Sequence, residues 1–204
     1  MAAGDFQRLG YRVLRGGLIA PLRETLLQVA GPLLDHARSR DWYETEGLAE
    51  GSTSWYGHKP VDTVMEFLAP MIAHATGTGP LWPTFSYLRL YPRGTKLGAH
   101  VDRDSCEIAI TAAVEGSDAV PWPIKLEAAD GTTQSVDLAP GDMLVYAGRE
   151  RRHWREPLEG DWRLQVMFFY VRQDGPFARW KYDTRPGLGE AAPDADPNIG
   201  EAAP

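Results

Sequence analysis

The chain has 204 residues, of which 43% are hydrophobic and 24% charged, and this composition fits one soluble globular domain with a sizeable core. Its formal net charge is −7 and its one basic cluster is short (residues 149–155), so we expect no nucleic-acid partner. Cys106 is the single cysteine, which excludes an intrachain disulfide, and no apolar run reaches the roughly 18 residues of a membrane span. No N-terminal pattern of a signal peptide is present. These features predict a cytoplasmic monomer or homodimer without a membrane partner.

The first 80 residues predict helices. Leucines recur at helical spacing over residues 20–39 and are interrupted at Gly31-Pro32, which predicts two short helices or one kinked helix. Residues 61–76 predict a further helix, and Asp62 is the expected N-cap. The apolar stripe expected on this helix consists of Val64, Phe67, Leu68, Met71 and Ile72.

Residues 41–60 lie between these helices and are polar, glycine-rich and aromatic. Such a composition favours a mobile loop with contact residues over a core segment. Trp42, Tyr43, Trp55 and Tyr56 could close over a pocket, and Trp55 and Tyr56 are therefore candidate substrate contacts.

From about residue 83 the pattern changes to short strands separated by turn signals. The expected strands are FSYLRLY, CEIAITAAV, PIKLEA, QSVDL, MLVYA and DWRLQVMFFYV. Strands of this length and spacing predict a mainly β fold, a sandwich or jelly roll, with the N-terminal helices packed outside one sheet. We expect one domain over residues 1–185, with the β core at about 83–185, and a flexible, acidic, Pro/Ala-rich tail over 186–204.

Four residues in the β region form a candidate metal site with an adjacent cation. His100 and Asp102 are two positions apart, so on a strand they would project from the same face. His153 could complete three ligands from a neighbouring strand, and two histidines with one carboxylate and open positions are typical of non-heme Fe(II) oxygenases. Arg163, ten residues after His153, could hold a carboxylate bidentately.

In these residues the chain resembles the Fe(II)/2-oxoglutarate-dependent dioxygenase superfamily, most closely its prolyl-4-hydroxylase-like branch. The resemblance covers roughly residues 83–185 and rests on YPRG before HVD, APGDMLVYAG before RRHW, and WR ten residues past the histidine. It implies a double-stranded β-helix, Fe(II) on His100, Asp102 and His153, and 2-oxoglutarate and O2 as co-substrates. Arg163 would bind the far carboxylate of 2-oxoglutarate.

Two further residues are candidate co-substrate contacts. Tyr91 corresponds to a tyrosine that is often near 2-oxoglutarate in related enzymes, although a buried tyrosine with a backbone partner explains it equally well. Thr111, on the strand after HVD, could face the same pocket.

The resemblance also suggests a reaction. The carboxylate of Asp102 implies hydroxylation or a related oxidation (desaturation or ring closure), because in halogenase relatives a small residue replaces it. Succinate and CO2 would be the co-products. The substrate would be a small molecule, such as an amino-acid derivative or biosynthetic intermediate, or alternatively a prolyl or other protein residue. A jelly-roll metal-binding module without turnover is the third hypothesis. Besides the aromatic loop, the candidate substrate contacts are Trp122, Trp154 and Arg155, and Trp122 could equally be a packing residue.

Overall fold

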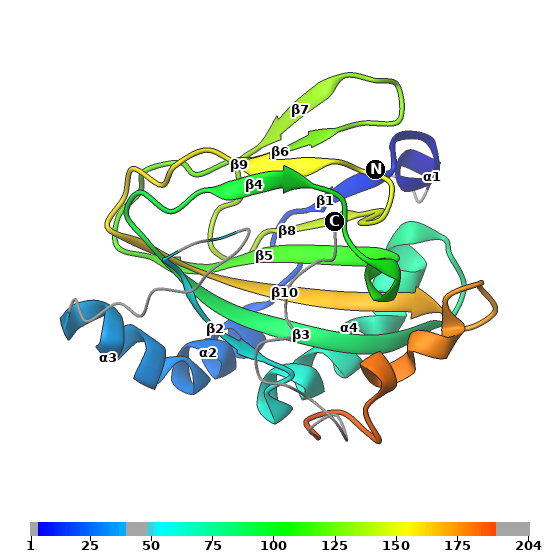
Figure 1. Ribbon diagram of the computed structural model, residues 1–204, viewed down its shortest axis with the longest axis horizontal. Helices are drawn as coiled ribbons and strands as arrows, with labels where there is room; N and C mark the ends of the chain where they lie inside the picture. Colours follow the sequence, from blue (N-terminus) through cyan, green and yellow to red (C-terminus); the bar gives the residue numbers. More distant parts are fainter. Residues whose placement is uncertain (1–3, 40–48, 50, 191–204) are drawn as a thin grey trace.

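The computed structural model describes residues 4–39, 49 and 51–190, which form two antiparallel β-sheets with helices on one side. The larger sheet has the strand order β1-β8-β5-β10-β3-β2, and the smaller sheet has the order β4-β9-β6-β7 (Figure 1). The strands are β1 (Tyr11–Leu14), β2 (Thr53–Tyr56), β3 (Leu81–Pro92), β4 (Leu97–His100), β5 (Ile108–Gly116), β6 (Ile124–Glu127), β7 (Thr133–Val136), β8 (Met143–Tyr146), β9 (His153–Arg155) and β10 (Trp162–Arg172). The helices are α1 (Gly4–Leu9), α2 (Ala20–Val29), α3 (Gly31–Ser39) and α4 (Lys59–Thr76), with short 3-10 segments η1 (Asp104–Cys106) and η2 (Ala178–Thr184).

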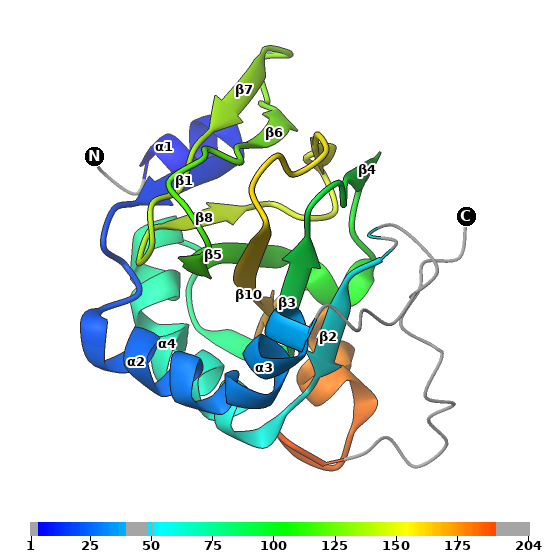
Figure 2. The ribbon, with the colours of Figure 1, turned by 90° about the vertical axis from the view of Figure 1, so that its left-hand side faces the viewer.

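The helices α2, α3 and α4 cover the outer face of the larger sheet, and the smaller sheet lies on its other side (Figure 2). This arrangement confirms the predicted jelly roll with helices on one sheet. Residues 20–39 form two short helices, as one of the two alternatives predicted. None of the helices in the described parts of the chain is long and apolar enough to cross a membrane.

The side chains of the central strand β10 alternate between the two faces of the larger sheet, one covered by the helices and the other by the smaller sheet. Leu164, Val166, Phe168 and Tyr170 are fully buried and pack in the core beneath the helices. Burial of each such side chain contributes about 1.5–3 kcal/mol. The Tyr170 hydroxyl also donates to the backbone carbonyl of Met65 on α4 at 2.6 Å. The alternate residues of β10 face the smaller sheet, as the alternation of side chains along a strand requires.

The helix α4 begins at Lys59, two residues earlier than predicted, and Asp62 does not cap it. The N-cap is His58, which makes no side-chain capping bond. Asp62 is fully buried: its Oδ2 lies 3.0 Å from Arg185 Nη1, and its Oδ1 accepts a 2.6 Å hydrogen bond from Ser86. The predicted cap was wrong because this carboxylate points into the sheet, where it joins α4 to β3 and to the C-terminal segment.

The predicted apolar stripe of α4 is only partly correct. Val64, Leu68 and Ile72 are buried, whereas Phe67 is 68% exposed and Met71 is 37% exposed. At 100° per residue, Phe67 and Met71 lie about 120° and about 80° around the helix from Val61, which is at the centre of the buried face. A helix on a sheet buries a limited arc, and these two side chains lie outside it.

The segment predicted as a loop over residues 41–60 contains an edge strand. Thr53–Tyr56 pairs antiparallel with β3, with Trp55 opposite Leu88. Threonine, tryptophan and tyrosine favour strands, and β3 offers an unpaired edge, so the loop prediction was wrong here. Trp42 and Tyr43 lie outside the described residues.

The first strand, β1, is an element that the sequence did not predict. It pairs with β8 and is fixed by the turn before β8. In that turn Asp142 accepts hydrogen bonds from Arg15 Nη1 at 2.6 Å and from the backbone N–H groups of Gly16 at 2.9 Å and Ala139 at 3.1 Å. The predicted APGD turn therefore also holds the N-terminal segment on the sheet.

The described residues after 185 contact the folded body. Leu188 packs against the core, and the Gly189 N–H donates to Asp62 Oδ2 at 2.9 Å. Residues 191–204, most of the predicted tail, lie outside the described residues.

Candidate metal centre

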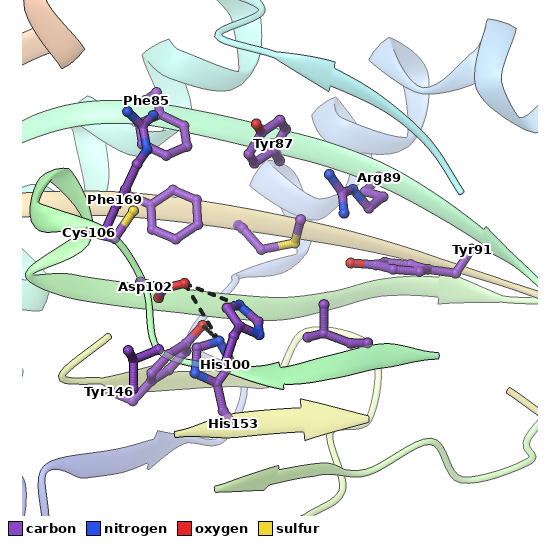
Figure 3. Close-up of a pocket in the computed structure, with 14 residues that line it drawn as sticks. Phe85, Tyr87, Arg89, Tyr91, His100, Asp102, Cys106, Tyr146, His153 and Phe169 are labelled. Atoms are coloured by element: carbon purple, nitrogen blue, oxygen red, sulfur yellow. Dashed lines mark hydrogen bonds and ion pairs between the residues drawn. The ribbon is translucent and has the colours of Figure 1, made fainter. Parts of the chain in front are cut away.

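The three predicted metal ligands come together where β4 meets β9. His100 is the last residue of β4 and is directly opposite His153, the first residue of β9. Asp102 lies beyond the end of β4, so strand alternation alone does not place it. Its backbone N–H donates to the Gly148 carbonyl at 2.9 Å, which turns the carboxylate toward the two histidines (Figure 3).

The geometry of the three side chains fits one metal ion. Asp102 Oδ1 lies 3.4 Å from His100 Nε2 and 3.7 Å from His153 Nε2, and the three ligand atoms lie within 4.8 Å of one another. Donor atoms about 2.1 Å from a common metal ion at right angles are about 3 Å apart, close to these separations.

Both histidines are oriented by backbone carbonyls on their far side. His100 Nδ1 lies 2.7 Å from the Gly98 carbonyl, and His153 Nδ1 lies 2.9 Å from the Arg151 carbonyl. Each Nδ1 therefore carries the proton and donates it, which leaves the Nε2 lone pair directed at the candidate site. This is the outer-shell arrangement that fixes the tautomer of metal-binding histidines.

The electrostatics of the site leave one carboxylate oxygen available for a cation. Asp102 Oδ2 is buried and has no hydrogen-bond partner among the described residues, a costly arrangement without a ligand. Burial lowers the pKa of His153, so this imidazole is neutral and can coordinate a metal. Burial opposes protonation of His100 too, but the hydrogen bond and charge of Asp102 outweigh it and raise its pKa.

The backbone at Gly148 approaches the site closely. A Cβ at this position would overlap Asp102 Oδ2 and lie 2.5 Å from the Cys106 carbonyl oxygen. Only glycine leaves room for the carboxylate at its observed position, which explains the glycine at the end of the APGDMLVYAG motif.

A pocket of about 130 Å³ lies beside the triad. Its opposite wall is the inner face of β3, and β10 contributes two further side chains (Figure 3). The lining residues are Phe85, Tyr87, Arg89, Tyr91, Leu97, His100, Val101, Asp102, Arg103, Cys106, Tyr146, His153, Met167 and Phe169.

Several of these residues were not singled out from the sequence. Tyr146 is buried and its hydroxyl lies 3.3 Å from His153 Nε2, the nitrogen that would bind a metal. Phe85, Tyr87 and Arg89 alternate with the core leucines of β3 in the same period as Tyr91. Strand periodicity in FSYLRLY and MLVY was the signal that could have found them.

Arg163 shares the β10 face of Met167 and Phe169 but does not line the pocket. It is 8% exposed, and it donates to the carbonyls of Asp118, at 3.3 Å, and Val120. Its Nε is buried without a hydrogen-bond partner among the described residues. The guanidinium is thus held behind the pocket by backbone acceptors.

Arg155 and Trp122 form a buried pair near Arg163, and neither lines the pocket. The Arg155 guanidinium donates to the Trp122 carbonyl, lies 4.5 Å from the centre of the indole ring, and leaves Nη2 without a partner among the described residues. Burial, with Arg163 among the smaller causes, lowers the pKa of Arg155 to about 10. Two buried guanidinium groups therefore lie behind the pocket, and Asp118 Oδ1 lies 3.9 Å from that of Arg163. Trp122 donates its indole N–H to Glu156 at 2.7 Å and is a packing residue.

Of the two predicted co-substrate contacts, Tyr91 lines the pocket and Thr111 does not. Tyr91 is 3% exposed, packs edge-on against Trp122, and directs its hydroxyl toward the interior (Figure 3). Thr111 is buried behind the wall and donates to Gln165 Oε1 at 3.4 Å.

The remaining candidate substrate contacts lie outside the pocket wall. Trp55 packs against the main core and against His58. Tyr56 lies over Phe85 and donates its hydroxyl to Asp183. Trp154 lies between His153 and Arg155 on β9, so it projects from the opposite face of that strand.

No family model matches this chain, and no curated protein matches it. Solved structures match over most of their length. SnoN, a non-heme alpha ketoglutarate dependent epimerase from nogalamycin biosynthesis, is 17% identical, with a TM-score of 0.69 over 96% of this chain and 95% of SnoN. A Pseudomonas putida prolyl-4-hydroxylase is 17% identical, with a TM-score of 0.62 over 84% and 97% of the two chains. EctD from S. alaskensis, solved with bound Fe, is 16% identical, with a TM-score of 0.65 over 93% and 84%.

At these identities the likeness establishes the fold. The neighbours confirm the predicted double-stranded β-helix and, at the level of the fold, the predicted resemblance to Fe(II)/2-oxoglutarate-dependent oxygenases.

Proposed function

We propose that this chain, which has the fold of the Fe(II)/2-oxoglutarate-dependent oxygenases, is a dioxygenase of that kind that hydroxylates an unactivated C–H bond of a small molecule. The observation that carries the proposal is the triad of His100, Asp102 and His153, whose ligand atoms lie within 4.8 Å of one another beside a pocket. Two imidazoles and one carboxylate with open positions suit Fe(II).

In this proposal the three side chains hold Fe(II) through two Nε2 atoms and the Asp102 carboxylate, whose unpaired Oδ2 fits a cation. When bound, iron and 2-oxoglutarate would supply dioxygen activation, with succinate and CO2 as co-products. The Tyr146 hydroxyl lies 3.3 Å from His153 Nε2, so it would have to release that nitrogen to a bound metal.

The two arginines behind the pocket, Arg163 and Arg155, support 2-oxoglutarate as the co-substrate. Arg163 and Arg155 are both buried, and each has an N–H group without a partner among the described residues. Arg163, turning from the backbone carbonyls that it now contacts, would bind the far carboxylate, and Tyr91 would face the same molecule. Metal binding alone does not require a cation for a carboxylate, so two buried arginines behind the metal site argue against a metal-binding module without turnover.

The pocket favours a small substrate over a protein. At about 130 Å³ it is narrow, and its walls are the aromatic side chains of β3 and β10. These walls would exclude water and orient the substrate. The alternative is a prolyl-type protein hydroxylase with the same chemistry, which the P. putida neighbour favours. SnoN, which has this fold, is an epimerase, so the fold is not restricted to hydroxylases.

The test is anaerobic titration of Fe(II) and 2-oxoglutarate into the protein. We expect a weak visible charge-transfer band and a rise in melting temperature, both lost in His100→Ala. The matched control is His74→Ala, which removes an exposed histidine from α4 and should retain both signals. Absence of band and melting shift in the wild-type protein would refute the proposal.

A further inference from the structure

Arg89 presents a cation to the pocket from the middle of β3. Figure 3 shows it on the inner face of the strand between Tyr87 and Tyr91, opposite the metal triad. Its guanidinium carbon lies 5.0 Å from the centre of the Tyr87 ring and 5.9 Å from that of the Tyr91 ring.

Arg89 differs from the nearby arginines in having neither an ion pair nor a side-chain hydrogen bond among the described residues. Arg103, which also lines the pocket, pairs with Asp183 at 2.6 Å. Arg163 lies 3.9 Å from Asp118 Oδ1, and both Arg163 and Arg155 donate to backbone carbonyls. Within residues 4–39, 49 and 51–190, Arg89 forms no ion pair with a carboxylate, and its Nε is buried without a hydrogen-bond partner.

The two tyrosines offset only part of this cost. A cation over an aromatic face gains about 0.5–2 kcal/mol, but the contact satisfies no N–H group. A guanidinium presents a rigid fork of donors that matches a carboxylate bidentately. We propose that Arg89 binds a carboxylate of a ligand in this pocket, and that the substrate is therefore an organic acid.

This inference rests on the proposed function and names its substrate class. The proposed function assigns the far carboxylate of 2-oxoglutarate to Arg163, and the carboxylate beside the keto group would lie at the metal, so the partner of Arg89 belongs to another molecule. Farther along the same wall, Phe85 stacks on Phe169 with ring centres 4.5 Å apart, and Met167 lies beside them. The pocket is thus cationic at Arg89 and aromatic at Phe85, where the Arg103 guanidinium lies 4.6 Å from the ring centre and is neutralised by Asp183. This arrangement fits an acid with an aromatic or other apolar part.

The experiment is calorimetric binding to protein loaded with Mn(II) in place of Fe(II), so that no turnover occurs. The probes are 3-phenylpropionate, its uncharged amide 3-phenylpropanamide, and 2-oxoglutarate. The variants are Arg89→Gln and the control Arg93→Gln, which removes an exposed arginine paired with Asp161 at the end of the same strand. Arg89→Lys keeps the positive charge but removes the bidentate pair of donors. It tests the preference for the acid if the Gln variant does not fold.

We expect the wild-type protein to bind the acid about tenfold or more tightly than the amide, the range of one charged hydrogen bond. Arg89→Gln should abolish this preference, Arg89→Lys should reduce it, and Arg93→Gln should keep it, while 2-oxoglutarate affinity stays within about threefold. A wild-type protein without acid preference, or a preference that survives in the Arg89 variants, overturns the inference. If Arg89→Gln instead weakens 2-oxoglutarate tenfold and leaves the probes unchanged, the carboxylate is the co-substrate's and the organic-acid assignment fails.

The same titrations separate this inference from the proposed function. A protein that binds neither Mn(II) nor 2-oxoglutarate, yet prefers the acid in an Arg89-dependent way, would disprove the dioxygenase and retain the carboxylate site.

Discussion

Replacement of Arg163 by alanine should weaken 2-oxoglutarate binding while leaving metal binding intact. The guanidinium lies behind the pocket and contacts none of the three metal ligands through any hydrogen bond recorded for the described residues. A charged hydrogen bond contributes about 1.5–3 kcal/mol. Because both Nη groups already have carbonyl acceptors, a ligand gains about one such bond rather than two. The dissociation constant of 2-oxoglutarate should therefore rise by about 10- to 150-fold.

A second variant tests the same side chain without removing its charge. Gly116 pairs directly with Arg163 across β5 and β10, and its φ is not positive. A Cβ at Gly116 would overlap Arg163 Nη1 and lie 2.8 Å from Cζ. Gly116→Ala should therefore displace the guanidinium and weaken 2-oxoglutarate in the same direction.

The assay is calorimetric titration of 2-oxoglutarate into Mn(II)-loaded protein, with Arg93→Ala as the control because that arginine is exposed, pairs with Asp161 and does not line the pocket. Metal affinity is measured separately for each variant. Unchanged 2-oxoglutarate affinity in Arg163→Ala would refute the assignment, and Arg155 would then be the cation to replace.

Three further predictions concern the supports of the site. Gly148→Ala should abolish metal binding by displacing the Asp102 carboxylate, whereas Gly31→Ala, at a position with open space, should bind metal normally. Tyr146→Phe should keep or tighten metal affinity by up to about tenfold, since a neutral hydrogen bond that competes for the metal-binding nitrogen is worth about 0.5–1.5 kcal/mol; a large loss would mean that the hydroxyl supports the metal. Asp142→Asn should lower the free energy of unfolding in urea by about 1–3 kcal/mol at neutral pH. Burial alone would raise the pKa of Asp142, but hydrogen bonds from an arginine and two backbone N–H groups lower it below 3.8, so its stabilisation is present above pH 3.8 and is lost as the pH falls through the folded-state pKa. A difference between variant and wild type that persists in strong acid would contradict this account.

Alternation along single strands was readable from the sequence, and the structure agrees with it. The even residues of β10 form the core, and the odd residues face the pocket side. The same alternation places Phe85, Tyr87 and Arg89 on the face of Tyr91 in β3, but of these four residues only Tyr91 belongs to a recognisable motif, YPRG.

Polar residues near element ends were the least predictable. Asp62 has the sequence context of a helix cap, and its role in a buried pair with Arg185 depends on a residue more than 120 positions away. The prediction that Phe67 is buried on α4 was wrong for a related reason, because the packing of the helix on the sheet determines which arc of the helix is buried. Local patterns carry no information about such long-range partners.

The types of side chain that form the candidate site could be read from the sequence: two histidines, one carboxylate and a following arginine, in a region whose strand lengths and turns fit a jelly roll. These features are local, because ligand type and strand period are properties of neighbouring residues. Which side chains share the pocket depends on the tertiary structure. Strand pairing and the paths of connecting loops place Arg163, Arg155 and Trp122 behind the pocket wall and Arg89 on it, and spacing along the chain contains no information about either placement.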